Sequence, residues 1–408
     1  MQTLDAGGFT TYSQTRDVSG QEVPDSRLAE IQKAHSEAER QLRHRAEREV
    51  PLEGNLLPAD GGGEHRLYEQ VTNPSVGDTL QIRVPDLATS DGCSNYVTVT
   101  GVVEAMGTEG IIIADTAAPT ATEGGYTDQD YQDFSDGLDQ RWPVLESHFG
   151  SPGDRDGNNR VVALFTPATT RGGANRLGFV YSGDLVSRST CPSSSEGEIF
   201  YGRVPDANIS YDYLSFLIPA TIQHELTHVI QNSRSGGGIA QHLAEGQAKL
   251  AEEISGHAST GRNTYQNYGY DVARDPDQSD GVQWYPDNFS DLYRYFGFES
   301  STSRIAGAPE ECGWWHSDSS PCVSRSLWYG VGWSFLRWVS DNYGPSYTGG
   351  EEQLHRDIIA DSDYGIPKVA KLVGSDMSTL MARWAAALYL DDRVSGLQDG
   401  LTYSSWDL

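Results

Sequence analysis

The segment that decides the fold runs Leu214-Ser-Phe-Leu-Ile-Pro-Ala-Thr-Ile-Gln-His-Glu-Leu-Thr-His-Val-Ile-Gln-Asn232. Its apolar residues recur at steps of three and four, which predicts a mostly buried helix with Pro219 near its first turn, where the missing N–H costs little. The helix is expected to end at Ser235-Gly-Gly-Gly238. His224 and His228 lie four residues apart, so their imidazoles share one face with room for a metal ion between them.

Glu225 is expected to lie beside this metal site and not in it. At 3.6 residues per turn, its side chain is about 100° round the helix from that of His224. A carboxylate there can act as general base for a water molecule at the metal, and neutral His nitrogens are common zinc donors. Polar groups buried on an apolar helix without partners are costly, so the context favours a metal site over a chance pattern.

A third ligand is needed, and the next helical segment, Ile239–Ile254, can fold back antiparallel to the first. Its candidates are His242, Glu245, Glu252 and Glu253. Glu245 is favoured because the adjacent Gly246 allows two backbones to approach closely. Glu252 and Glu253 are expected to face solvent, since Glu is seldom fully buried. His242 remains the alternative to Glu245 as the third ligand.

These segments resemble a gluzincin metallopeptidase, and in particular the hyicolysin-type family of secreted bacterial zinc peptidases. The resemblance covers roughly Asp78 to Asp392. Three further stretches carry it: Phe149-Gly-x5-Asp156-Gly-x2-Arg160-Val-Val-Ala-Leu, Tyr329-Gly-x4-Phe335-Leu-Arg-Trp-x3-Asn342-Tyr-Gly and Trp384-Ala-Ala-Ala-Leu-Tyr-Leu-Asp-Asp392. It implies that His224, His228 and Glu245 hold Zn²⁺ and that Glu225 is the base.

The sequence departs from the pattern of the family at two positions near the third ligand. Ala244 stands where the family often has Asn directly before the ligand Glu. Lys249 stands four residues beyond that Glu, where thermolysin-like relatives have an acidic residue. Both departures concern the residues around the ligands and not the ligands themselves.

Tyr329 is the candidate donor to the oxyanion that develops on the peptide carbonyl during hydrolysis. Tyr329-Gly-Val-Gly332 opens an apolar helix, Trp333 to Val339, and is similar to the Tyr-x-x-Gly that carries the oxyanion tyrosine in aminopeptidase-N-like gluzincins. The alternative is a tyrosine that only packs in the core. Weaker rivals for the oxyanion role are His257, His316 and Tyr270.

The expected function is therefore zinc-dependent hydrolysis of peptide bonds, with a protein or peptide as substrate and endopeptidase action as the default. Two alternatives stay open: a zinc hydrolase acting on a non-peptide substrate, and a non-catalytic, peptidase-like binding protein. Binding alone has no use for a base at Glu225, which favours an enzyme.

Charge and hydropathy exclude other classes of partner. The chain has 408 residues, enough for one large core or two, and a formal net charge of −29. Such acidity argues against nucleic acid or an anionic membrane surface, because phosphates would be repelled. Without 18 consecutive apolar residues, no transmembrane helix is predicted. We expect a monomer.

The four cysteines indicate an oxidising compartment. Cys93, Cys191, Cys312 and Cys322 show no Cys-x-x-Cys spacing, and an even count suits two disulfides. Cys312 and Cys322 bracket a short loop and are expected to pair, which leaves Cys93 with Cys191. The alternative is four free, buried thiols. The N-terminus lacks the features of a signal peptide, so secretion would require a signal outside this sequence or another route.

Three zones are expected along an α+β chain. Residues 1–66 contain a charged helical pattern, Ser26–Glu49, with a thin apolar stripe and a Pro/Gly-rich boundary after it, which is typical of a linker or a detachable pro-segment. Residues 67–124 form a small β region, either a separate domain or the first part of the main sheet. Residues 125–400 form a zincin-like domain with a mixed sheet, the active-site helix and a helical C-terminal lobe. An exposed edge of that sheet would receive the substrate as an added strand.

Overall fold

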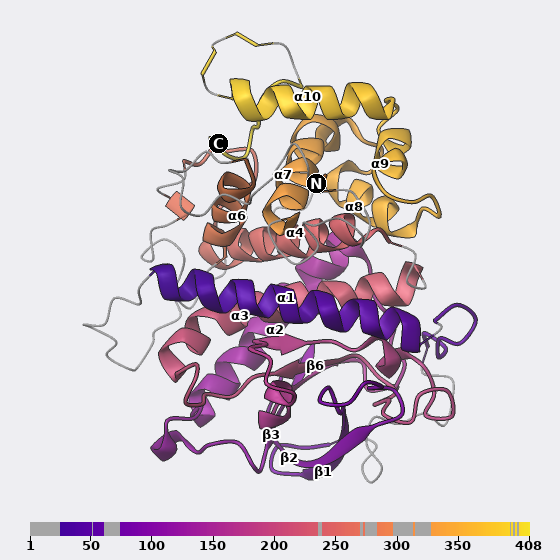
Figure 1. Cartoon of the computed structure of the whole chain (residues 1–408), viewed down its shortest axis with the longest axis vertical. Helices are drawn as coiled ribbons and strands as arrows, with labels where there is room; N and C mark the ends of the chain where they lie inside the picture. Colours follow the sequence, from indigo (N-terminus) through magenta and orange to yellow (C-terminus); the bar gives the residue numbers. More distant parts are fainter. Residues whose placement is uncertain are drawn as a thin grey trace.

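The computed structural model describes residues 25–50, 52–60, 74–235, 239–269, 272–273, 284–296, 313–314, 328–391, 393–394, 396–397 and 400–408. The fold is mixed, with one curled sheet and helices packed against it (Figure 1). Figure 1 shows the first helix, drawn in indigo, crossing the middle of the molecule between the sheet and a helical C-terminal lobe.

The six described strands form one mixed sheet in the order β1-β2-β3-β4-β6-β5. Their bounds are β1 Thr79–Pro85, β2 Tyr96–Met106, β3 Gly110–Asp115, β4 Val161–Phe165, β5 Gly178–Phe179 and β6 Ile199–Gly202. The first three are antiparallel neighbours, β4 pairs in parallel with β3 and β6, and β5 pairs antiparallel with β6 at the edge. The N-terminal strands therefore join the main sheet and do not form a separate β domain.

Alternation along the strands divides the core into two apolar clusters. Val161, Ala163 and Phe165 of β4 face the cluster that contains most of the helices. Val162 and Leu164 face the opposite cluster, together with the inward residues of β1. Because successive side chains of a strand point to opposite faces, this central strand is apolar throughout, whereas β1 alternates.

The helices that precede and carry the predicted site begin close to where the sequence places them. Helix α2 spans Asp128–Phe149, and the side chain of Thr127 caps it by accepting a hydrogen bond from Asp130 N–H. Helix α3 spans Tyr211–Ser235 and α4 spans Gln241–Thr260. Since α3 begins before Leu214, Pro219 lies inside the helix and not near its first turn, which corrects the expectation.

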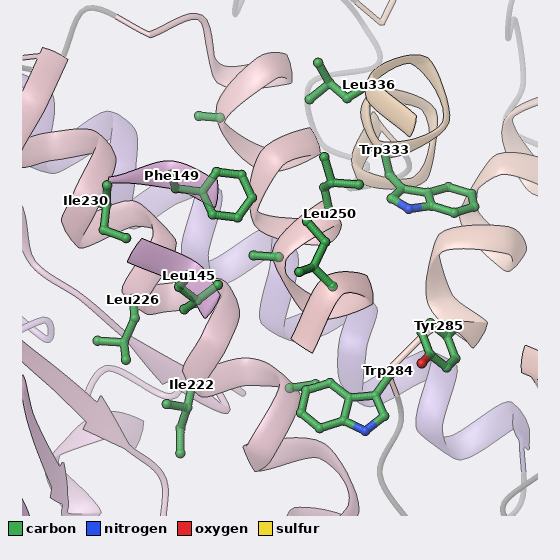
Figure 2. Packing of buried hydrophobic residues seen from close by; sticks show 14 of the residues in the cluster. Leu145, Phe149, Ile222, Leu226, Ile230, Leu250, Trp284, Tyr285, Trp333 and Leu336 are labelled. Carbon is green, nitrogen blue, oxygen red and sulfur yellow. The ribbon is translucent and has the colours of Figure 1, made fainter. Parts of the chain in front are cut away.

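The C-terminal lobe consists of α6 Pro286–Phe296, α7 Trp328–Tyr343, α8 Gly350–Ala360, α9 Ile366–Leu372 and α10 Met377–Leu390. Helices α4 and α7 approach closely at two glycines: a Cβ on Gly246 would lie 2.7 Å from the carbonyl carbon of Gly332. Only glycine fits at this crossing. Figure 2 shows the side chains that join α2, α3, α4 and α7: Leu145, Phe149, Ile222, Leu226, Ile230, Leu250, Trp333 and Leu336.

Helix α1, Asp25–Glu49, is packed into the fold. The members of its predicted apolar stripe, Leu28, Ile31, Ala38 and Leu42, are all buried. Leu28 and Ile31 belong to the cluster around α3 and α4, whereas Leu42 belongs to the cluster on the other face of the sheet. The helix thus touches both cores, and its role as a pro-segment stays a prediction.

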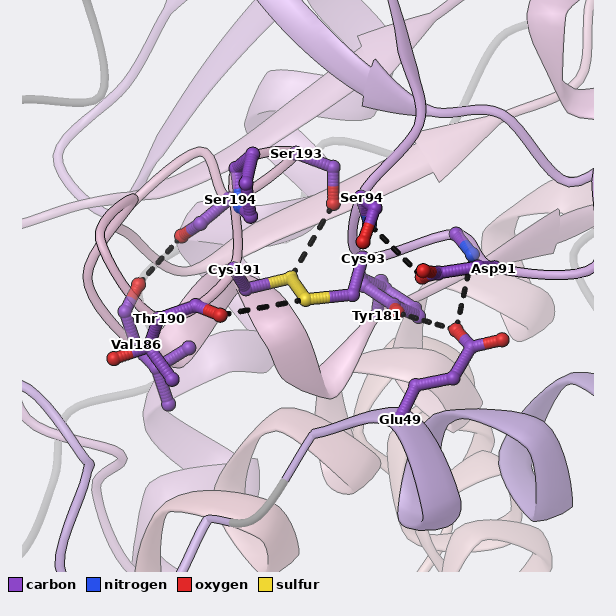
Figure 3. The surroundings of a disulfide bond; sticks show 12 residues. Glu49, Asp91, Cys93, Ser94, Tyr181, Val186, Thr190, Cys191, Ser193 and Ser194 are labelled. Carbon is purple, nitrogen blue, oxygen red and sulfur yellow. Dashed lines mark hydrogen bonds between the residues drawn. A yellow bond between two sulfur atoms is a disulfide. The ribbon is translucent and has the colours of Figure 1, made fainter.

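A disulfide joins Cys93 to Cys191, with their Cα atoms 4.9 Å apart (Figure 3), which confirms this expected pairing. The end of α1 is tied to the same region, because Glu49 Oε2 accepts hydrogen bonds from the Tyr181 hydroxyl and from Gly92 N–H. Cys312 and Cys322 lie outside the described residues. Within the described chain, every helix is too short or too polar to span a membrane.

Asp184 should make stability fall as pH rises. Burial raises the pKa of this carboxyl to about 8, although Ser195 N–H and the Tyr201 hydroxyl donate hydrogen bonds to it. Between about pH 5 and 7 only the unfolded chain has released this proton, so the free energy of unfolding drops by up to about 1.4 kcal/mol per pH unit. In urea titrations across this range, Asp184→Asn should remove that slope. An equal slope in both proteins would contradict the assignment.

Candidate metal centre

The predicted ligands converge between α3 and α4. His224 and His228 are both buried on one face of α3, with ring centroids 4.9 Å apart. Glu245 of α4 is fully buried, and its Oε2 lies 3.4 Å from His224 Nε2 and 3.3 Å from His228 Nε2. The antiparallel return of α4 therefore brings the third predicted ligand to the two histidines.

The atoms that face one another in this cluster lack hydrogen-bond partners. These are His224 Nε2, His228 Nε2 and Glu245 Oε2. Each such buried group costs roughly 1–3 kcal/mol when left unsatisfied. A cation at their common centre would bind all of them at once, and one ligand atom from each residue lies within 4.8 Å of the others. The donor set of imidazole nitrogen and carboxylate oxygen thus fits a metal ion.

The far nitrogen of each histidine is held in place. Nδ1 of His224 lies 2.7 Å from Glu252 Oε1, and Nδ1 of His228 lies 2.8 Å from Gln231 Oε1. Such contacts fix the tautomer and leave Nε2 free for a metal. Gln231 is itself anchored by donating to the carbonyl of Ala244, the residue that departs from the pattern of the family.

The expectation that Glu252 and Glu253 face solvent is wrong. Glu252 is 5% exposed and pairs with Lys249 as well as with His224. Glu253 is fully buried and accepts hydrogen bonds from Trp333 and Trp406. A signal for Glu252 was present, because it follows Glu245 by two helical turns and therefore shares its face.

Glu252→Gln is expected to weaken metal binding by roughly 10- to 100-fold, the usual effect of losing a partner of a metal-bound histidine. The amide oxygen can still accept from the imidazole, but the negative charge that makes His224 more basic is gone. Competition with a chromophoric chelator measures the effect. Glu30→Gln, on the exposed face of α1, is the matched control. Equal affinities in both variants would show that Glu252 does not act on the centre.

Glu225 lies beside the cluster and not in it. Its Oε2 accepts a hydrogen bond from Val180 N–H, directly after edge strand β5, while its Oε1 has no hydrogen-bond partner. Burial raises the pKa of Glu225 to about 8, and the negative charge of nearby Glu39 adds to the rise. Burial thus makes this carboxyl a better proton acceptor than an exposed one, as a general base requires.

Tyr329 also reaches the site. Its ring lies parallel to that of His224, with the centroids 5.9 Å apart, and its hydroxyl is within 3.3 Å of Glu39 Oε2. His257, a rival for the oxyanion role, contacts Glu253 and stacks on Trp406 in another part of the core. The other two rivals, residues 270 and 316, lie outside the described residues.

His242, the competitor of Glu245, lies apart from the cluster. It is buried against Trp314, with the ring centroids 5.3 Å apart, and burial lowers its pKa to about 4. Glu245 belongs to the group of described residues that could share a metal ion with His224 and His228, and His242 does not.

One residue of the cluster was missed entirely. Glu39 of α1 is 4% exposed, and its Oε1 lies 2.9 Å from His228 Nε2 and 3.4 Å from His224 Nε2. Burial alone would raise the pKa of Glu39, but the two imidazoles hold it well below its usual range. The weak signal was its spacing of three from Leu42, which puts it beside the buried stripe.

Comparison with known proteins adds no family to these observations. The sequence matches no protein-family model, and a search of curated proteins finds no significant match. What the chain offers is a buried His/Glu centre that can hold a metal ion, with a carboxyl and a tyrosine beside it.

Proposed function

We propose that the protein is a zinc-dependent peptidase with a zincin-like catalytic unit, similar to the gluzincins of the hyicolysin type. The observation that carries this proposal is the convergence of the unpartnered atoms of His224, His228 and Glu245, with the carboxyl of Glu225 beside them. Two imidazoles and one carboxylate are a common catalytic zinc set. The disulfide agrees with action outside the cell.

The metal and the residues around it would have different roles in hydrolysis. When bound, zinc would lower the pKa of a water molecule toward about 7 and polarise the scissile carbonyl. Glu225 would take the proton from the attacking water and then deliver it to the leaving amine. Its burial supports this role, because burial raises the pKa of the carboxyl and makes it a better proton acceptor.

The edge of the sheet supports a peptide as the substrate. Strand β5 lies at one edge of the sheet, and the residue after it, Val180, donates its N–H to Glu225. An extended peptide that paired with this edge would bring its backbone past the metal centre. Backbone pairing accepts many sequences, as a peptidase needs, whereas a small ester would gain nothing from it.

Tyr329→Phe is expected to lower kcat by roughly 10²- to 10³-fold if the hydroxyl donates to the oxyanion. Zinc content should stay unchanged, because Tyr329 is not a ligand in this assignment. The measurement is steady-state hydrolysis of a peptide by the most active form of the chain, either intact or released from α1, with zinc determined in the same sample. Full turnover with zinc intact would reduce Tyr329 to a packing residue.

The proposed function is tested by hydrolysis of fluorescent casein, compared with small amides and esters, by the intact chain and by the chain released from α1 as described below. Phenanthroline should abolish cleavage of casein, and added Zn²⁺ should restore it. Cleavage of the small substrates alone would indicate a non-peptide hydrolase. If the chain binds one zinc but hydrolyses none of these substrates, even after release of α1, the protein is a binding protein and not an enzyme.

A further inference from the structure

Helix α1 lies directly over the metal centre. Three of its side chains, on one face at steps of four, meet the predicted machinery: His35 Nε2 is 3.7 Å from Glu225 Oε1, Glu39 contacts both histidines, and Arg43 Nη1 is 2.8 Å from Glu245 Oε1. The segment that the sequence marks as separate from the catalytic zone is thus engaged with its ligands and with its base.

We propose that Glu39 is the fourth ligand of the metal and that α1 is a built-in inhibitor, which keeps the peptidase latent until the helix is released. This inference rests on the proposed function, because it assigns a ligand and a regulator to the same zinc site.

The unpaired buried atoms of the cluster favour a metal with four protein ligands. Glu39 Oε1 is buried without a hydrogen-bond partner, as are the facing atoms of the other three residues. These four residues form a single group of candidate ligands, all of them buried. A catalytic zinc keeps one position open for water or substrate, whereas four protein ligands close the site. With Glu39 bound, the site is closed, and its two carboxylates face both the dication and the guanidinium of Arg43.

The same helix blocks the groups that a substrate would use. His35 Nδ1 accepts the N–H of Leu177, immediately before β5, so a backbone donor of the edge is already taken. The Tyr329 hydroxyl donates to the carbonyl of Ser36 and to Glu39. The space left between α1 and His224 is about 20 Å³, room for about one water molecule. No peptide fits while the helix is in place.

Release of α1 requires that its covalent link to the sheet be cut. The chain continues from Glu49 to β1 at Thr79, with Gly61-Gly-Gly63 between them. The end of α1 is also held by hydrogen bonds at Glu49 and by the burial of Leu42 and Ala46. These contacts are non-covalent, so cleavage in this stretch converts a permanent inhibitor into a dissociable one.

The ligand role of Glu39 is tested in the full chain loaded with Co²⁺, whose visible spectrum reports the ligands. Acetohydroxamate is the probe, and the variants are Glu39→Gln, Glu39→Ala and the exposed control Glu30→Gln. An intramolecular ligand competes at an effective concentration of millimolar or more, so both Glu39 variants should bind the probe at least roughly tenfold more tightly. Their spectra before addition of the probe should also differ from those of the parent and control.

The outcomes separate the two proposals. Equal spectra and equal affinities in all four proteins, each with bound Co²⁺, would overturn the role of Glu39 and leave the metal centre intact. Failure of every protein to bind Co²⁺ would remove the metal centre and the inference together. Altered spectra with tighter probe binding would support Glu39 as ligand, even if no form of the chain hydrolysed protein, in which case only the peptidase proposal fails.

The inhibitory role is tested by cutting the folded chain. A recognition sequence for a specific protease replaces Gly61–Gly63, and the full chain is folded before it is cut and passed over a sizing column. Loss of the α1 fragment should be accompanied by a rise of at least about tenfold in acetohydroxamate affinity and by the appearance of casein cleavage. If the fragment leaves and the affinity for the probe does not change, α1 is not an inhibitor.

Discussion

Glu225→Gln should leave a folded chain that still binds its metal but hydrolyses protein roughly 10²- to 10⁴-fold more slowly, the usual range for loss of a general base. The amide keeps the shape of the side chain and can still accept from Val180 N–H. It cannot take a proton from water at neutral pH. The rate is measured on casein in the form of the chain that is most active, either intact or released from α1.

The control for this prediction is metal content. Zinc should be the same in Glu225→Gln and in the parent, because this carboxyl flanks the candidate ligands without belonging to their group. Glu30→Gln, on the exposed face of α1, should be unchanged in both activity and zinc. Parental turnover in Glu225→Gln would exclude it as the base and direct attention to another group at the site.

His228→Ala should lose the metal. Its Nε2 faces Glu245 and Glu39, and no other described side chain can replace it in that position. Zinc at 100 times its Kd should stabilise the parent by about 2.7 kcal/mol, since only the folded chain presents the complete site. The variant should gain almost none of this. Urea unfolding with and without added Zn²⁺ measures the difference.

His242→Ala is the matched control, because it removes a buried histidine of α4 that faces Trp314 and not the cluster. It should be less stable than the parent but should still gain stability from zinc. If His242→Ala lost the zinc effect and His228→Ala kept it, the assignment of the ligands would be wrong.

The sequence pattern was sufficient to predict features that lie within a single helix or strand. Apolar spacing predicted the helix that carries His224 and His228. Residues 67–124 were predicted as a β region, and they contain strands β1, β2 and β3. These succeed because a periodic segment has one apolar face to bury, whatever it packs against.

Contacts between distant segments could not be predicted in this way. Glu252 looked like a solvated residue, because sharing a helix face with Glu245 does not by itself show that it meets His224. Glu39 was hidden for the same reason, since its partners lie far away along the chain. A buried carboxylate is acceptable only when its partners are also buried, and the sequence does not show which segments meet. Glu245 was found because a close helix crossing at Gly246 limited the choice.

The central claim, a zinc ion held by His224, His228 and Glu245, is tested most directly by zinc content together with zinc-edge X-ray absorption on the intact chain. The account predicts one zinc per chain, with two imidazole nitrogens and carboxylate oxygens at about 2.0–2.2 Å and no sulfur. A second carboxylate in the shell would be Glu39. A chain that purifies and refolds without tightly bound metal, or a shell that contains sulfur or a single imidazole, would contradict the account.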